Sequence, residues 1–359
     1  MHLQFARPVI RLGMGNSDDD YWMTRALAQG SRGIGLTSPN PPVGAVIVKN
    51  SAVIGEGHHR KAGGPHAEIE ALRDAAYKEH DARGATAYVT LEPCSTQGLT
   101  PPCTEALIRA GVSCVVYGAT DPNPKHAGNA DAVLRKAGIE VLSGVLREEC
   151  ERLIHPFSKW IKMGLPYVIA KVGQSLDGRI SRPPKEEKWI TSEESREHAM
   201  TLRIRSDAIL IGAETLRKDD SRLTLRGADI PPEKEQPWRV VVTRSGKLPR
   251  KAHVFTDEFK DRTIVLHGDY KFKDLLRELA KRDITTVLIE GGGNLLGQAF
   301  AARAVDEVFW YIAPRICAGG TVSTGGIEFP KKARSVVLGD VWHEMIGDNI
   351  CVHGYPIWD

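Results

Sequence analysis

Hydrophobic positions along the first half of the chain recur with the spacing of helices and of short strands in turn. Runs rich in Val, Ile and Gly predict a hairpin over residues 43–57 that turns at Lys49, Asn50 and Ser51. The other elements expected here are helices at residues 18–30, 66–80, 101–111 and 130–138, and strands at residues 85–91, 113–119 and 139–144. This alternation is typical of a three-layer α/β domain.

A second series of strands and helices begins at about Pro166. Thr191 and Glu194 have the spacing of a capping box, which predicts the start of a helix. Polar segments that contain proline, at residues 181–188 and 227–237, are expected to be surface loops. The remaining elements expected are strands at residues 166–172, 207–212, 238–244, 263–268, 285–290 and 306–314, and helices at residues 191–203, 272–283 and 294–304.

Length and composition describe a water-soluble protein of two domains. A chain of 359 residues exceeds the size at which one hydrophobic core stops growing. No repeat links the halves, and we place the boundary near Met163 and Gly164, giving domains at residues 15–163 and 165–359. The net charge of +3 gives no argument for nucleic acid, and no apolar run approaches a membrane span. Six cysteines and an opening unlike a signal peptide favour a reducing, cytoplasmic setting.

The stretch "PHAEIEAL" places His66 and Glu68 two positions apart at the start of an expected helix. Glu68 could be an ordinary first-turn acid favoured by the helix dipole, with His66 as a surface neighbour. Alternatively, His66 could hold a metal ion while Glu68 moves protons beside it. The pair alone does not decide between these interpretations.

Two cysteines downstream favour the metal. Cys94 and Cys103 are separated by eight residues in "EPCSTQGLTPPC", and each follows a proline. A lone cysteine is usually a small buried hydrophobe, but one imidazole and two thiolates leave a tetrahedral zinc one open position. Zinc deaminases use this arrangement, with a glutamate that is not a ligand as proton shuttle. Their usual spacing is Cys-x-x-Cys, so the wider gap requires an explanation.

The whole chain resembles the bifunctional deaminase–reductase family of riboflavin biosynthesis, the RibD type, in which the wider cysteine spacing is normal. The resemblance covers about residues 20–355 and is carried by "TSPNPPVGAVIV", "GHHRKAGGPHAEIEAL", "AYVTLEPC", "TPPC", "PYVIAKVGQSLDGR", "LRIRSDAILIGAETL" and "LIEGGGNLLGQAF". It implies a cytidine-deaminase-like domain followed by a dihydrofolate-reductase-like domain. The implied chemistry is zinc-dependent deamination of a ribosylaminopyrimidine phosphate, a small molecule, and then NADPH-dependent reduction of its ribosyl group to ribityl.

The resemblance assigns roles in the first domain residue by residue. His66, Cys94 and Cys103 match the zinc ligands, and Glu68 matches the proton shuttle. Asn40 and His59 match substrate contacts. The alternative for Asn40 is a turn residue between prolines, and for His59 a solvated loop residue. The family also leads us to expect a homo-oligomer.

In the second domain, the glycine-rich turn before an expected helix offers backbone N–H groups to a phosphate, although a glycine triplet is more often a plain tight turn. By resemblance, the cofactor contacts are Gly173, Trp189, Thr215, Asp219, Gly292, Gly293, Asn294 and Leu295, and the substrate contacts are Lys171, Arg203, Leu223, Arg226 and Glu290. Arg203 and Arg226 could form a fork for a phosphate, or belong to a solvated face. Trp189 could equally be a core residue.

The sequence departs from the family at positions that bear on the substrate. Thr96 and Leu99 stand where the family usually carries a His and a Lys or Arg, and Glu187 stands where it carries a Ser. Losing cationic donors removes charge that would meet a substrate phosphate. Two alternatives therefore accompany the bifunctional enzyme: a paralogue with another pyrimidine or pterin-like substrate or with one active domain, and a non-enzymatic binding module.

Overall fold

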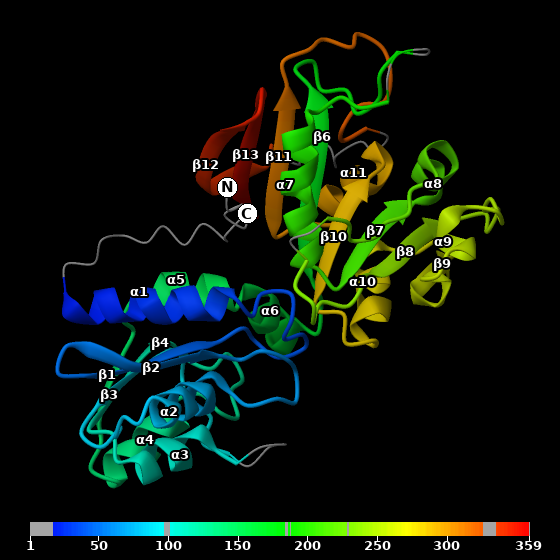
Figure 1. Ribbon diagram of the computed structural model, residues 1–359. Coiled ribbons are helices and arrows are strands. Elements are labelled where there is room, and N and C mark those ends of the chain that lie inside the picture. The colour runs from blue at the N-terminus through cyan, green and yellow to red at the C-terminus, as the bar shows by residue number, and fades with distance from the viewer. Residues whose placement is uncertain are drawn as a thin grey trace. The chain divides into compact units, whose positions relative to one another are not determined.

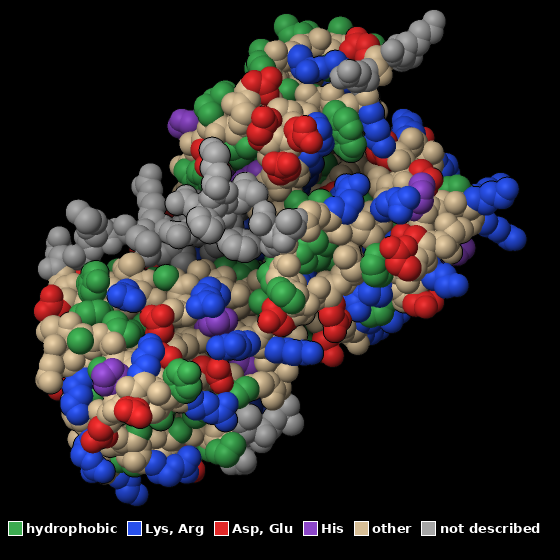
Figure 2. Space-filling view, in the orientation of Figure 1, with side chains coloured by type: hydrophobic (Ala, Val, Ile, Leu, Met, Phe, Trp, Pro, Cys, Tyr) green, Lys and Arg blue, Asp and Glu red, His purple; other side chains and the backbone are tan. Residues whose placement is uncertain are grey.

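The computed structural model describes residues 17–96, 101–183, 186, 188–227, 230–325 and 335–358. The chain divides into two compact units, Met1–Gly164 and Leu165–Asp359 (Figure 1). Among the described residues, no helix combines the length and apolar character that crossing a bilayer requires. On the face shown in Figure 2, acidic and basic side chains are interspersed on both units.

The first unit is built on a five-stranded sheet with the order β2-β1-β3-β4-β5. Its strands are β1 (Gly44–Lys49), β2 (Ala52–His58), β3 (Thr86–Leu91), β4 (Cys114–Ala119) and β5 (Glu140–Ser143). β1 and β2 form the expected antiparallel hairpin, and β3, β4 and β5 run parallel. The hairpin turns at Asn50 and Ser51, whose φ angles of 52° and 57° give the left-handed turn that matches the strand twist.

Helices cover both faces of this sheet, which confirms the three-layer expectation. Successive side chains of a strand point to opposite faces, so β1 contributes Ala45 and Ile47 to one core and Val46 and Val48 to the other. α2 (Ala67–Tyr77), α3 (Cys103–Ala110) and α4 (Asn129–Lys136) supply the first core, and α1 (Asp18–Ser31) and α5 (Arg147–Leu153) the second (Figure 1). Both faces of β1 are therefore shielded from water.

The second unit contains an eight-stranded sheet with the order β12-β13-β11-β6-β10-β7-β8-β9. The neighbouring strands from β11 to β9 are parallel, and an antiparallel hairpin of β13 and β12 closes the other edge. Its strands are β6 (Tyr167–Ser175), β7 (Ala208–Gly212), β8 (Trp238–Thr243), β9 (Thr263–His267), β10 (Thr286–Gly291), β11 (Glu307–Ala313), β12 (Val337–Ile346) and β13 (Asn349–Ile357). Its helices are α7 (Glu193–Ile204), α8 (Ala213–Asp219), α9 (His253–Thr256), α10 (Phe272–Ala280) and α11 (Gly293–Ala301), with a short 3-10 turn at Lys260–Arg262.

Two features differ from the sequence-based expectation. The capping box at Thr191 is wrong by one residue, because the N-cap of α7 is Ser192, whose hydroxyl accepts the N–H of Ser195 at 3.3 Å. The other difference is a set of elements that the pattern did not predict: α5, α6 (His155–Met163), α8, α9, β12 and β13. Three of them, α5, α8 and α9, are short helices, and β12 exposes much of both faces, so its alternation of apolar and polar residues is weak.

Candidate active sites of the two units

Three potential metal ligands meet where β3 ends and two helices begin. His66 immediately precedes α2, Cys94 follows β3, and Cys103 is the first residue of α3. The His66 Nδ1 atom lies 3.5 Å from the Cys94 sulfur and 3.2 Å from the Cys103 sulfur. A tetrahedral zinc with Zn–S and Zn–N distances of about 2.3 and 2.1 Å separates such atoms by about 3.6 Å. The donor set and its spacing therefore fit zinc, with all three ligand atoms within 4.8 Å of one another.

The two thiols have pKa values shifted in opposite directions. A hydrogen bond with Cys103 and another with His66 lower the pKa of Cys94 to about 4, and the Cys94 contact together with burial raises the pKa of Cys103. The backbone N–H of Cys103, at the start of α3, also donates to the Cys94 sulfur at 3.2 Å. Negative charge is thus already stabilised at Cys94, which is the protonation state that a metal ligand needs.

Glu68 lies beside this cluster, in the first turn of α2, and its residue is only 3% exposed. Burial raises the pKa of its carboxyl to about 7, an effect that the nearby Cys94 reinforces. Glu68 does lie in the first turn of α2, but its burial beside the cysteines distinguishes it from an ordinary first-turn acid exposed to solvent. A carboxyl that titrates near neutral pH can both accept and release a proton.

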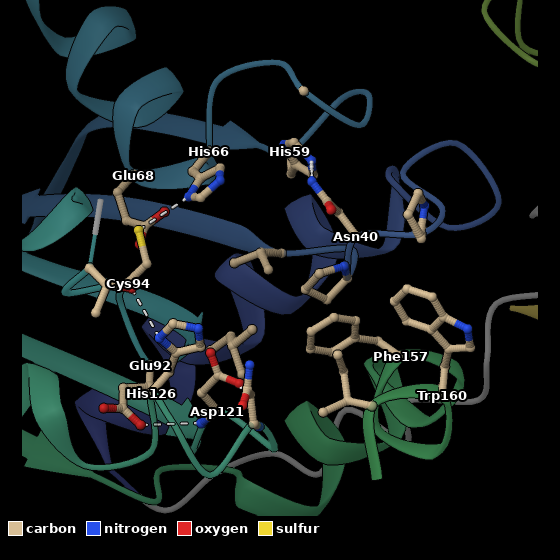
Figure 3. Close-up of a pocket in the computed structure, with 18 of the residues that line it drawn as sticks. Asn40, His59, His66, Glu68, Glu92, Cys94, Asp121, His126, Phe157 and Trp160 are labelled. Carbon is tan, nitrogen blue, oxygen red and sulfur yellow. Dashed lines mark hydrogen bonds between the residues drawn. The ribbon is translucent and has the colours of Figure 1, made fainter. Parts of the chain in front are cut away.

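These residues open onto a cavity of about 520 Å³ whose described lining residues belong to the first unit (Figure 3). Asn40 and His59 lie in its wall, with Asn40 Nδ2 3.2 Å from His59 Nε2. His59 Nδ1 lies 2.9 Å from the carbonyl oxygen of Pro65, and burial lowers the pKa of the imidazole. Because His59 is only 3% exposed, the alternative of a solvated loop residue is wrong.

The cavity also contains residues that the sequence did not single out. Figure 3 shows Phe157 and Trp160 of α6 on one wall, and Asp121 and His126 on another. The two aromatic residues are three positions apart, a spacing that places them on one face of a helix. The sequence therefore contained this signal, but α6 was not among the predicted helices. Asp121 and His126 lie in a loop after β4, and only the fold brings this loop to the zinc ligands.

The second unit places a compact ionic cluster at the carboxyl end of its sheet. Arg203 of α7 makes two hydrogen bonds with Glu290 at the end of β10, Nε to Oε1 at 2.5 Å and Nη2 to Oε2 at 2.7 Å. Its Nη1 donates to the carbonyl oxygen of Thr224 at 2.7 Å. Both side chains are largely buried, so Arg203 belongs neither to a solvated face nor to a free phosphate fork. The positive charge of Lys171 on β6 helps to lower the pKa of Glu290. Burial lowers the pKa of the Lys171 amine itself.

The glycine-rich turn after β10 comes close to α8. Gly291 and Gly292 have φ angles of 157° and 84°, and a Cβ on Gly292 would lie 3.2 Å from the Thr215 hydroxyl. A Cβ on Gly293 would collide with the carbonyl oxygen of Val322. Asn294 is exposed in the first turn of α11, and Leu295 is buried. Packing alone therefore requires small residues at Gly292 and Gly293, whether or not a ligand binds at the start of α11.

The remaining residues expected in the second unit have varied surroundings. Trp189 is 52% exposed, which makes the core alternative wrong, and its ring lies beneath Lys188 and Arg196. Leu223 is buried with a φ of 53°, Arg226 is exposed, and the carbonyl oxygen of Asp219 accepts a hydrogen bond from Lys188. Gly173 lies on β6, where a Cβ would meet the Thr191 methyl group at 3.1 Å. Leu99 and Glu187 lie outside the described residues.

Comparison with known proteins identifies the family. Residues 166–352 match the model of the RibD C-terminal domain, and residues 16–119 match that of the cytidine and deoxycytidylate deaminase zinc-binding region. The riboflavin biosynthesis protein RibD of Escherichia coli K12 is 38% identical over 93% of this chain and 98% of its own length. The chain belongs to the RibD family. RibD of Mycobacterium tuberculosis is 42% identical over 80% of this chain and 83% of its own.

Solved structures of the RibD family agree with this fold. Acinetobacter baumannii RibD has a TM-score of 0.83 at 37% identity, and covers 94% of this chain and 99% of its own. A Thermotoga maritima deaminase/reductase has a TM-score of 0.84 at 36% identity, with the same coverage. The chain is therefore a bifunctional enzyme of riboflavin biosynthesis, with a zinc-dependent deaminase domain and an NADPH-dependent reductase domain. A non-enzymatic binding module is excluded.

Proposed function

We propose that the first unit deaminates 2,5-diamino-6-(5-phosphoribosylamino)pyrimidin-4(3H)-one and that the second unit reduces the ribosyl group of the product to ribityl. The observation that carries the proposal is the cluster of His66, Cys94 and Cys103 beside the buried Glu68, on a cavity of about 520 Å³. The Thermotoga maritima relative is named a diaminohydroxyphosphoribosylaminopyrimidine deaminase/5-amino-6-(5-phosphoribosylamino)uracil reductase, which supports this choice of substrate.

His66, Cys94 and Cys103 would hold the zinc ion. When bound there, zinc supplies a Lewis acid that activates water at neutral pH. Glu68 takes the proton that the water loses and delivers it to the amino group that leaves as ammonia. Its buried position and its pKa of about 7 suit both transfers, since neither protonation state is strongly favoured.

The rest of the cavity would position the ring. Asn40 and His59 form a hydrogen-bonded pair on the wall, and the Asn40 side chain keeps its oxygen available to a polar ring atom. Phe157 and Trp160 offer flat apolar surfaces against which a pyrimidine can pack (Figure 3). The alternative of an ordinary turn residue at Asn40 describes its backbone, whose N–H donates to the carbonyl oxygen of Thr37, but does not account for the side chain, which lies in the cavity wall and pairs with His59.

In the second unit, NADPH would bind along the carboxyl ends of the strands and the start of α11. The residues proposed to contact it are Gly173, Trp189, Thr215, Asp219, Gly292, Gly293, Asn294 and Leu295. Lys171, Glu290, Arg203, Leu223 and Arg226 would contact the substrate. Within this set the guanidinium of Arg203 also holds the Glu290 carboxylate through two hydrogen bonds, and the exposed Arg226 offers a further cation to a phosphate.

We infer that the enzyme works in the cytoplasm as a homo-oligomer. All six cysteines are free thiols, as a reducing compartment maintains them. The edge strand β12 exposes Val337, Val341 and Met345, and an apolar edge of this kind supports association with a second copy. Analytical ultracentrifugation of the purified chain tests the second inference, and a monomer at micromolar concentration would refute it.

The experiment that tests the proposed function is an assay of purified, zinc-loaded protein with the diaminopyrimidine ribotide, following ammonia and NADPH oxidation separately. We expect ammonia without NADPH, and NADPH oxidation only once deaminated product is present. Deamination of a different pyrimidine in preference to the ribotide would favour a paralogue. Ammonia release with no NADPH oxidation on the deaminated product would leave only the first unit active.

A further inference from the structure

One imidazole in the deaminase cavity has no role in the proposed chemistry. His126 is half-buried in the loop after β4 and lines the same cavity as Glu68 and Cys94 (Figure 3). Its Nδ1 atom lies 3.0 Å from the hydroxyl oxygen of Thr96, which follows Cys94 by two residues. The hydrogen bond joins two loops from different strands and fixes the direction of the ring. With Nδ1 held by Thr96, Nε2 is the nitrogen left to meet a ligand.

Hydrogen bonds to Glu92 and within the loop hold the loop that carries His126 in place. The carboxylate of Glu92 accepts the backbone N–H groups of Asp121, Gly128 and Ala130 at 3.2, 3.0 and 3.2 Å, which ties both ends of the loop to β3. Inside the loop, Asp121 accepts the N–H of Asn123, and the Asn123 carbonyl accepts the N–H of His126 at 2.9 Å. A ligand that binds here therefore pays little entropy to order the loop.

The charges of the described cavity lining favour such a donor for an anionic substrate. Glu68, Glu92 and Asp121 line it, but no Lys or Arg is among its described lining residues, and residues 97–100, which lie outside the described part, contain none. The only side chains of the described lining that can carry positive charge are three histidines. A phosphate group would meet mainly negative charge without at least one of them.

Two of the three histidines are already committed. His66 directs its Nδ1 atom at the two cysteine sulfurs. His59 has both ring nitrogens engaged, Nδ1 with the carbonyl oxygen of Pro65 and Nε2 with Asn40. Lys171, which the sequence predicts as a substrate contact of the second domain, belongs to the second unit, where its charge acts on Glu290. His126 remains.

We propose that His126, oriented by Thr96, is a specificity-determining residue of the deaminase, whose Nε2–H donates to the phosphate of the substrate. The inference rests on the proposed deaminase function and adds to it the group that selects a phosphorylated substrate. Asn123 shares the loop and the cavity wall, and its side-chain oxygen accepts the N–H of Lys125 at 3.1 Å. Asp121 is an opposing charge that interacts with His126, and its carboxylate accepts the N–H of Asn123 at 2.8 Å.

The test compares the phosphorylated ribotide with the dephosphorylated nucleoside in steady-state deamination by the zinc-loaded full chain. His126→Ala should raise KM for the ribotide roughly tenfold to a hundredfold, the range expected for losing a hydrogen bond to a charged group. KM for the nucleoside should move far less. Thr96→Val should raise the ratio of KM for the ribotide to KM for the nucleoside by a smaller factor. Thr96→Ser should keep the wild-type ratio, because the hydroxyl is retained.

Lys125→Ala provides the matched control, because Lys125 is the neighbouring cation on the same loop but is exposed and outside the cavity lining. We expect it to keep the wild-type preference. An equal loss of preference in Lys125→Ala would show that distant charge and not contact selects the phosphate. An equal rise in KM for both substrates in His126→Ala would show that His126 contacts the shared part of the substrate. Either result overturns the proposal.

A binding measurement separates this inference from the proposed function. Ribose 5-phosphate titrated into the zinc-loaded protein at fixed pH should shift the NMR signals of the His126 imidazole, and ribose at the same concentration should not. If the wild-type protein released no ammonia from either substrate, the proposed function would fail, yet this shift would still report on His126. A protein that deaminates the ribotide but shows no shift and no effect of His126→Ala would retain the function and refute the inference.

Discussion

Arg203 and Glu290 form a two-pronged ion pair between α7 and the end of β10, with N–O distances of 2.5 and 2.7 Å. Burial by itself would raise the pKa of Glu290, but the Arg203 charge and hydrogen bonds lower it, so the carboxylate is ionised at neutral pH. Lys171 lies close enough to contribute to the same effect. The pair thus holds one carboxylate in a fixed orientation at the proposed reductase site.

Glu290→Gln should therefore damage the second unit alone. Removing one partner of a buried ion pair leaves an unpaired cation and costs about 3–5 kcal/mol of unfolding free energy. We expect NADPH oxidation to be lost and ammonia release to be kept, measured on the same preparation. Glu278→Gln, which breaks the surface pair with Lys281, is the control and should change neither activity. A parallel loss of deamination in folded, zinc-loaded Glu290→Gln would mean that the two activities are coupled.

The metal site gives a second prediction. The wild-type protein should contain about one zinc ion per chain, and Cys94→Ala should lose it, because two ligands hold zinc far more weakly than three. Cys114→Ala, which removes a thiol from β4 that is not in the cluster, should keep the metal. Metal analysis of freshly purified protein gives the answer, and zinc-free wild-type protein would contradict the assignment.

Glu68→Gln separates coordination from proton transfer. The variant should retain zinc, since Glu68 is not among the three ligands, and should lose ammonia release by at least about a hundredfold, the usual contribution of a general acid–base group. Zinc content and ammonia are measured together. Near-normal ammonia release by the zinc-loaded variant would assign proton transfer to another residue.

The cofactor site is best tested at Asn294. Gly293→Asp would be ambiguous, because a side chain there collides with Val322 and would disturb the packing itself. Asn294→Asp adds a carboxylate at an exposed position in the first turn of α11, which the helix dipole tolerates. We expect Kd for NADPH to rise about tenfold or more through repulsion of the cofactor phosphates, with thermal stability unchanged. Unaltered NADPH binding would place the phosphates elsewhere.

Acid stability should depend on Glu307 of β11. Burial opposes ionisation of Glu307, but Arg205 and His353 lower its pKa to about 2. A carboxyl with a lowered folded-state pKa stabilises the fold above its unfolded pKa of about 4.5 and loses this contribution as pH falls toward 2. The contribution is about 3 kcal/mol by that difference.

Glu307→Gln should consequently have a lower free energy of unfolding than the wild type at pH 7. This difference in unfolding free energy should become smaller between about pH 5 and pH 2. The measurement is the midpoint of urea unfolding across this range. Glu214→Gln serves as control, because Glu214 pairs with Arg217 and Lys218 on the surface and should matter little at any pH. If the difference in unfolding free energy between Glu307→Gln and the wild type stayed constant from pH 7 to pH 3, the ion pair would not titrate as proposed.

The sequence by itself determined most of the regular elements and the chemistry of the metal site. Runs of Val, Ile and Ala with a period of two or four fix which segments become buried strands or helices, because those faces must leave water. The turn at Asn50 and Ser51 followed from residues that tolerate positive φ. His66, Glu68, Cys94 and Cys103 were predictable because few residue types bind zinc and move protons, and their order along the chain is itself informative.

Only the tertiary structure decided which polar groups meet. Nothing local in the sequence pairs Arg203 with Glu290, or Thr96 with His126, since each contact joins segments that are distant in the chain. The same holds for Phe157 of α6, because helical spacing alone does not say which part of the fold the helix will pack against. Side-chain partners depend on strand order and on the packing of helices against the sheet. Strand order and helix packing are properties of the whole unit. They depend on contacts between distant segments, and the chain entropy lost in forming those contacts is offset only when the whole core assembles.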